Sequence, residues 1–120
     1  GLETEMRVVY SEGVAVGRIS LQTFVSAFAT TPARLFGLYP RKGTIAVGGD
    51  ADLLLLDPAG TQTIDERTLH SRAGYDPFQG LEVRGVPRLT LSRGEVVARD
   101  GQLLSRPGRG RLVLRQRARG

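Results

Sequence analysis

Four consecutive leucines, Leu53 to Leu56, place the strongest constraint on how this chain can fold. Successive side chains of a β-strand point to opposite faces of a sheet, so a strand through this run is apolar on both faces. Such a strand is stable only where both of its faces are covered. The chain offers little cover beyond its own helices, and we therefore expect the sheet to need a partner.

The residues before this run carry the signals of helices. Apolar side chains recur at the spacing of one helical face after Ser20, which can cap the helix that they indicate. These side chains are Leu21, Phe24, Val25 and Phe28. A further helical turn is expected over residues 6–12.

A second short helix is expected over residues 32–36. Thr31 can cap this helix, and Pro32 suits its first position, where the missing N–H costs nothing. Gly37 can adopt the left-handed conformation that commonly ends a helix.

After Gly43 the pattern changes to that of short strands. Asp100-Gly101 is the strongest hairpin signal, because a type I′ turn needs a positive φ at both central residues. Arg93-Gly94 is expected to turn the preceding pair of strands. Strands are expected over 44–47, 53–57, 81–84, 89–92, 96–99 and 102–104, with a short helix over 64–71 and a loop over 75–80. Helices followed by strands indicate an α+β fold or two separate domains.

Three aspartates near the leucine run could form a site. Asp50, Asp52 and Asp57 lie within eight positions, and hard cations bind clustered carboxylates. Their spacing does not match that of an EF-hand loop. Asp50 occupies a position where a turn favours a short polar side chain, and Asp57-Pro58 is expected to end a strand. We interpret the three aspartates as turn and end residues of a β-hairpin.

The sequence lacks the motifs of the common catalytic and nucleotide-binding sites. It has no cysteine, and its single histidine, His70, cannot alone build a hydrolytic zinc site, which needs three or more protein ligands. No Gly-x-Ser-x-Gly elbow, phosphate loop or dinucleotide fingerprint is present. We expect His70 on a peripheral helix or loop.

The net charge of +5 comes from the carboxyl-terminal residues. Residues 101–120 contain six arginines and no acidic side chain, which leaves the rest of the chain close to neutral. This tail has no aromatic residue on which a base could stack, so a solvated or subunit-contacting tail is expected and no nucleic-acid partner. No apolar run approaches the roughly 18 residues of a membrane span, and a soluble, cytoplasmic protein without a membrane partner is expected.

Several sequence motifs together resemble one enzyme family. One stretch of this chain reads "RISLQTFVSAFATTPARLFGLYPRKGTIAVGGDADLLLLDP". It is similar to the segment of dihydropyrimidinases and D-hydantoinases in which the last barrel helices return to a small β-domain. The likeness continues through "YDPFQGLEVRGVPRLTLSRGEVVARDG" to "PGRGRLV". The stretch after the family's last catalytic barrel strand resembles "GLETEMRVVYSEGV". The resemblance therefore covers nearly the whole chain and points to its carboxyl-terminal segment.

This resemblance implies an α+β fold of a particular kind. The terminal helices of a TIM-type barrel would be followed by a short-stranded, mainly antiparallel small β-domain. Residues 1–42 would be the helical part of the barrel, 43–106 the small β-domain and 107–120 an arginine-rich tail. The amidohydrolase fold would be incomplete, because a whole (β/α)₈ barrel needs about 250 residues and the chain has 120.

Members of the family are hydrolases that open cyclic amide rings, such as dihydropyrimidines and hydantoins, at a site with two metal ions, usually zinc. The family's metal ligands lie on barrel strands that precede the resembling segment, and Lys42 does not match its bridging lysine. The resemblance implies no catalytic residue, no metal ligand and no cofactor in this chain, whereas two zinc ions are expected in the intact family enzyme. The chain alone is expected to be inactive, and whether it is an enzyme is left open.

The resemblance also implies partners and one substrate contact. The partners are the remainder of the catalytic barrel and further copies of the chain, since family members form tetramers. Gly1 would lie at the edge of the loop that borders the substrate. Two alternatives stay open: a non-catalytic interaction or assembly module of the same fold, and a piece of an allantoinase-like or dihydroorotase-like enzyme.

Overall fold

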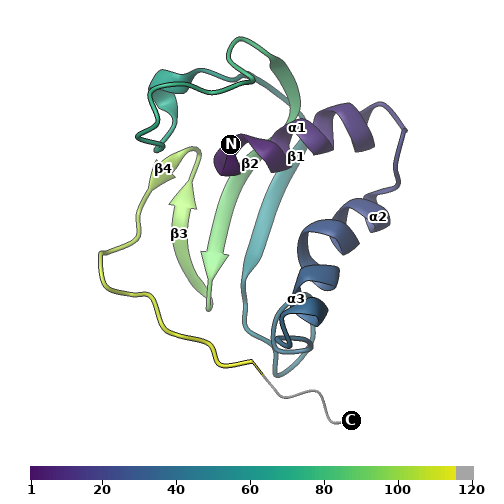
Figure 1. Ribbon diagram of the computed structural model, residues 1–120, viewed down its shortest axis with the longest axis vertical. Coiled ribbons are helices and arrows are strands. Elements are labelled where there is room, and N and C mark those ends of the chain that lie inside the picture. Colours follow the sequence, from purple (N-terminus) through teal and green to yellow (C-terminus); the bar gives the residue numbers. More distant parts are fainter. Residues whose placement is uncertain (116–120) are drawn as a thin grey trace. The chain divides into compact units, whose positions relative to one another are not determined.

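The computed structural model describes residues 1–115, and residues 116–120 lie outside the described part (Figure 1). The chain divides into two compact units. The first unit contains Gly1–Phe24 and Leu56–Val86, and the second contains Val25–Leu55 and Pro87–Gly120. The expectation for the arginine-rich tail falls partly on residues outside the described part.

The first unit begins with a helix in two parts. Helix α1 spans Leu2–Val9 and runs directly into η1, a π-helical segment over Tyr10–Ala15. Acidic side chains stabilise the first turn of a helix through its dipole, and α1 has Glu3 and Glu5 there. The helical turn expected over 6–12 is confirmed, and the helix extends beyond it in both directions.

A second helical run consists of three short elements without a break. They are α2 (Leu21–Val25), the π-helical η2 (Ser26–Thr30) and α3 (Thr31–Leu35). Ser20 caps this run as expected, because its Oγ accepts a hydrogen bond from the Thr23 N–H at 3.0 Å. Of the expected apolar stripe, Phe24 is buried, whereas Leu21 and Val25 are about half exposed.

The prediction that Thr31 caps a separate helix is wrong. Thr30 and Thr31 both have helical backbone angles, because η2 continues into α3 and leaves no free helix start to cap. The expected end of the helix is confirmed, since α3 stops at Leu35 and Gly37 has a φ of +67°.

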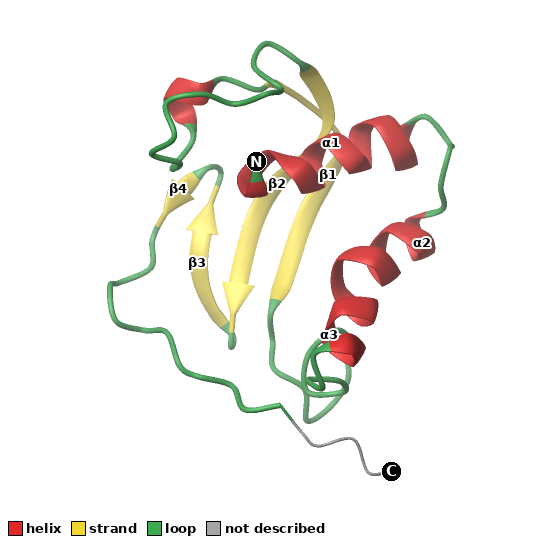
Figure 2. Ribbon diagram, in the orientation of Figure 1, coloured by secondary structure: helices red, strands yellow, loops and turns green. Residues whose placement is uncertain are grey.

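Four strands form one sheet in the order β1-β2-β3-β4 (Figure 2). Their bounds are β1 Leu53–Thr63, β2 Glu82–Ser92, β3 Glu95–Arg99 and β4 Gln102–Leu103. Strands β2 and β3 pair antiparallel, as do β3 and β4. With helices first and an antiparallel sheet after them, the expected α+β class is confirmed.

Two hairpin turns agree with the sequence. Arg93-Gly94 joins Ser92 to its partner Glu95, and both turn residues have a positive φ, of 51° and 77°. Asp100-Gly101 joins Arg99 to Gln102 in the same way, with φ values of 46° and 79°. Positive φ at both central residues is the requirement of a type I′ turn, so these predictions are confirmed.

Other strand predictions are wrong in their bounds. No strand forms over 44–47 within the described residues, and Ile45 and Val47 are fully or almost fully exposed in a series of turns. The hairpin expected around Asp50 is therefore absent from the described chain. Strand β1 continues through Asp57-Pro58 instead of ending there, and the strands expected over 81–84 and 89–92 are one strand.

The short helix expected over 64–71 is also largely wrong. Only a 3₁₀ turn, η3 (Glu66–Thr68), forms there, and Asp65 caps it by accepting the Arg67 N–H at 3.0 Å. The loop expected over 75–80 is confirmed.

The core of the first unit centres on Tyr10 in η1. Its ring meets the Phe24 ring edge to face, with 5.6 Å between the centroids. The same ring lies on the backbone of Gly85 in β2, where a Cβ atom would overlap it. The Ser11 Oγ accepts the Arg84 N–H at 3.0 Å and fixes η1 to the same strand. Val83 and Ile64 are almost fully buried in this unit.

The leucine run does not become buried. Leu54 and Leu55 point to opposite faces of β1 and are 43% and 50% exposed. The expectation that the chain lacks cover for this strand agrees with these exposures.

We expect Gly85→Ala to lower the free energy of unfolding by about 3 kcal/mol, because it combines a positive φ of 95° with overlap on the Tyr10 ring. Gly101→Ala is the matched control, since its φ is 79° and no atom lies within 4 Å of the new Cβ. It is expected to cost about 1 kcal/mol, from the backbone alone. Urea unfolding measures both, and equal losses would contradict the packing of Tyr10 on Gly85.

Candidate functional site

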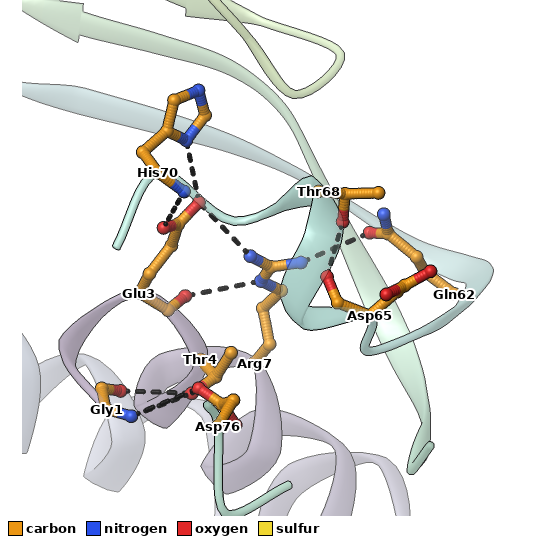
Figure 3. A network of polar contacts seen from close by, with 9 residues as sticks. All are labelled: Gly1, Glu3, Thr4, Arg7, Gln62, Asp65, Thr68, His70 and Asp76. Carbon is orange, nitrogen blue, oxygen red and sulfur yellow. Dashed lines mark hydrogen bonds and ion pairs between the residues drawn. The ribbon is translucent and has the colours of Figure 1, made fainter. Parts of the chain in front are cut away.

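A network of polar contacts in the first unit lies where α1 begins (Figure 3). The helix supplies Glu3, Thr4 and Arg7, and Gly1 precedes it as the N-cap residue. The chain between β1 and β2 supplies Asp65, Thr68, His70 and Asp76, and β1 supplies Gln62. Residues about 70 positions apart in the sequence therefore meet in one network.

The Asp76 carboxylate accepts hydrogen bonds from both segments. Its Oδ2 lies 2.9 Å from the Thr4 Oγ and 3.2 Å from the Gly1 nitrogen, and its Oδ1 accepts the Phe78 N–H at 2.8 Å. Thr4 is fully buried and Asp76 is 8% exposed. Burial acts to raise the pKa of Asp76, but the hydrogen bonds from Phe78, Thr4 and Gly1 hold this pKa below its ordinary value. The carboxylate is thus bound in its charged form.

The Glu3 carboxylate makes a second link, in which the helix supplies the acceptor and the loop supplies the donor. Its Oε2 accepts the His70 N–H at 2.8 Å, and its Oε1 lies 2.9 Å from the His70 Nδ1. Burial acts to raise the pKa of Glu3, but the hydrogen bonds from His70 hold it below the ordinary value. His70 lies in a loop, as expected, and its ring serves this link between loop and helix.

Arg7 extends the network to β1. Its Nη1 donates to the Gln62 Oε1 at 3.3 Å, and its Nη2 lies 3.9 Å from the Glu3 Oε1. Asp65 is bound locally, where hydrogen bonds from Arg67 lower its pKa to about 2. The network therefore fixes the start of α1 to the loop and the strand.

The aspartates near the leucine run lie in the second unit and bind basic groups. Asp50 accepts from the Arg41 Nε at 3.0 Å and forms an ion pair with Lys42 at 2.8 Å. Asp52 also pairs with Lys42 and accepts the Arg93 N–H at 2.8 Å. A hydrogen bond from Lys42 lowers the pKa of Asp50. Both carboxylates stabilise this turn by binding basic groups and a backbone N–H, and neither is a central residue of a hairpin.

Asp57 bonds within its own strand. Its Oδ1 accepts the N–H groups of Ala59 and Gly60, both at 3.1 Å. Short aspartate side chains commonly bond the backbone two residues on, so this interaction is local even though the strand continues past it.

A hydrolytic metal pair does not fit these residues. Among residues 1–115, no group of three or more histidine, cysteine, aspartate or glutamate side chains could hold a metal ion. The Nδ1 of His70 already faces Glu3. Among the same residues, no helix is both long enough and apolar enough to span a bilayer.

Sequence reasoning did not find the links through Thr4, Glu3 and Asp76. No local motif announces them, because the partners are 72 and 67 residues apart. Only the fold shows that Thr4 and Asp76 are buried, and buried polar groups need hydrogen-bond partners.

The chain belongs to a known protein family. Residues 6–98 match the model described as the amidohydrolase family. The chain is 47% identical over 114 residues to D-hydantoinase of Geobacillus stearothermophilus, which covers 95% of this chain and 24% of the relative. It is 45% identical over 116 residues to D-phenylhydantoinase of Escherichia coli O1:K1 / APEC, covering 97% of this chain and 25% of the relative.

Solved structures give the same result. D-Hydantoinase (dihydropyrimidinase) from Thermus sp. has a TM-score of 0.92 and 44% identity, over 96% of this chain and 25% of that one. L-Hydantoinase (dihydropyrimidinase) from Arthrobacter aurescens has a TM-score of 0.85 and 46% identity, over 88% of this chain and 23% of that one. The resemblance to hydantoinases is confirmed, and the chain spans about a quarter of the length of these relatives.

We expect the stability that Asp76 supplies to depend on pH in one direction. Because its folded pKa is lowered, the contribution is complete above the ordinary aspartate pKa of about 4 and is lost as the pH falls through the folded value. The difference in unfolding midpoint between the parent chain and Asp76→Ala should be constant above about pH 5 and shrink below about pH 4. Glu66→Ala, which removes an exposed charge from the same loop, is the control. A difference that grows on acidification would contradict this assignment.

Proposed function

We propose that this chain is the carboxyl-terminal part of a dihydropyrimidinase or hydantoinase-type hydrolase, which opens cyclic amide rings at a two-metal site. The observation that supports this most is the 42–47% identity to hydantoinases over almost the whole chain, together with TM-scores up to 0.92. In this proposal, residues 1–42 are the last helical part of the barrel, 43–106 belong to the small β-domain and 107–120 form the tail.

The metal ligands and the catalytic residues are then supplied by chain outside these 120 residues. Ligand chemistry supports this division, since a hydrolytic zinc centre needs several histidine or carboxylate ligands and the sequence has one histidine and no cysteine. The zinc pair belongs to the intact enzyme in this proposal, and the chain alone neither holds it nor turns over substrate. The intact enzyme is proposed to be a cytoplasmic homo-oligomer.

The role of this chain is to support the site. Gly1 is proposed to lie at the edge of the substrate loop, and Gly1 begins the helix that Asp76 and His70 hold through Thr4 and Glu3. The exposed leucines of β1 are proposed to pack against the remainder of the enzyme. A non-catalytic assembly module of the same fold is the alternative, and the same exposed residues would serve its contacts.

A segment exchange tests this proposal. The matching quarter of the Geobacillus stearothermophilus D-hydantoinase is replaced by this chain, and hydantoin ring opening and metal content are measured. Because the contacts to the host are not all identical, we expect a metal-loaded chimera with reduced but measurable turnover. The host enzyme cut and rejoined with its own segment is the control.

The outcomes separate the two functions. Turnover in the chimera supports a hydrolase segment. A folded chimera that binds its metals but shows no turnover would contradict the proposal and favour the non-catalytic module.

A further inference from the structure

The segment His70–Asp76, called the strap below, is bonded to the start of α1 at its two ends (Figure 3). At one end, His70 binds Glu3 through its backbone N–H and its ring. At the other end, Asp76 binds Thr4 and Gly1. Within the described chain, no hydrogen bond or ion pair joins residues 71–75 to α1, and all five of these residues are exposed.

The two ends differ strongly in burial. The side chains of Glu3 and His70 are 32% and 53% exposed, whereas the Asp76 side chain is 4% exposed and Thr4 is fully buried. An exposed polar contact of this kind contributes little. Breaking the contacts of Asp76 removes hydrogen bonds from a nearly buried carboxylate and costs more. The His70 end is therefore the weaker of the two.

Glu3 also keeps a partner when His70 leaves. Arg7 lies one turn along α1, with its Nη2 3.9 Å from the Glu3 Oε1, and its Nε donates to the Glu3 carbonyl oxygen at 3.4 Å. Arg7 is the charged side chain of α1 that faces Glu3, and Asp76 is faced by the Thr4 hydroxyl, the Gly1 nitrogen and the Phe78 N–H. Opening at the His70 end breaks contacts that are already partly exposed, whereas opening at the Asp76 end withdraws a nearly buried carboxylate from Thr4 and Gly1 and uncovers the buried Thr4.

We propose that the strap is a hinged cover on the first turn of α1, which opens from its His70 end while Asp76 remains bound as the hinge. The device has two states, closed with both ends bonded and open with His70 released. Loss of the Glu3 carboxylate favours the open state and does not affect the buried end.

Amide exchange at two positions follows the two ends separately. The His70 N–H donates to Glu3 across the contact with α1, whereas the Phe78 N–H donates to Asp76 two residues earlier and reports whether the loop at the hinge stays formed. We expect Glu3→Ala to speed exchange of the His70 amide about fivefold and to leave the Phe78 amide unchanged.

Cleavage by trypsin distinguishes opening of the strap from loss of one hydrogen bond. Arg72 lies inside the strap, and cleavage after it requires the segment to leave the surface. We expect Glu3→Ala to increase the rate of cleavage at the Arg72–Ala73 bond, followed by mass spectrometry. Glu66→Ala, which removes one negative charge from an exposed position of the neighbouring turn, is the matched control and is expected to change neither readout.

Three results would overturn the hinge. They are equal acceleration at His70 and Phe78 in Glu3→Ala, unchanged exchange at His70, and unchanged cleavage after Arg72. Asp76→Ala is expected to accelerate exchange at both positions, and the Glu3 variant still decides the matter if the Asp76 variant fails to fold. None of these measurements uses enzyme activity, so their outcome is independent of the proposed function.

Discussion

The fold of this chain is limited by how much apolar surface its own residues can bury. Two leucines on opposite faces of β1 remain about half exposed, whereas the well-buried large side chains of the first unit include Tyr10, Phe24, Ile64 and Val83. Full burial of a leucine supplies roughly 1.5–3 kcal/mol, so a half-exposed leucine forgoes about half of that. A segment that spans about a quarter of its hydantoinase relatives is expected to show such surfaces where the rest of the fold would lie.

Polar links compensate for part of this limited core. Asp76 and Thr4 are 72 residues apart, and their buried bond joins the start of the chain's first helix to a loop that has little apolar cover of its own. The link is specific because a buried carboxylate must keep its donors, which restricts the positions of both segments. In the proposed enzyme this contact would hold the helix start next to the substrate loop.

The sequence predicted the features that local chemistry decides. Ser20 caps its helix, Gly37 follows the end of α3, and the two turns Arg93-Gly94 and Asp100-Gly101 form because glycine tolerates a positive φ. The α+β class followed from the change of pattern near Gly43. The family followed from the combination of motifs and not from any single residue.

Features that depend on distant partners were beyond local signals. Residues 44–47 have the composition of a strand but lack a neighbouring strand in the described chain, and Lys42 binds the aspartates that follow them. Asp57-Pro58 has the composition of a strand end, yet β1 continues through it beside β2. The network at α1 escaped prediction for the same reason, since its bonds join residues whose proximity only the fold creates.

We propose that these residues support a hydrolytic centre whose metal ligands lie in chain outside them. The metal content of the purified 120-residue chain, measured by elemental analysis after incubation with zinc and exhaustive dialysis, tests this proposal. We expect no tightly held metal pair, because one histidine without cysteine cannot supply the ligands. Two zinc ions retained per chain, and lost in His70→Ala, would contradict it.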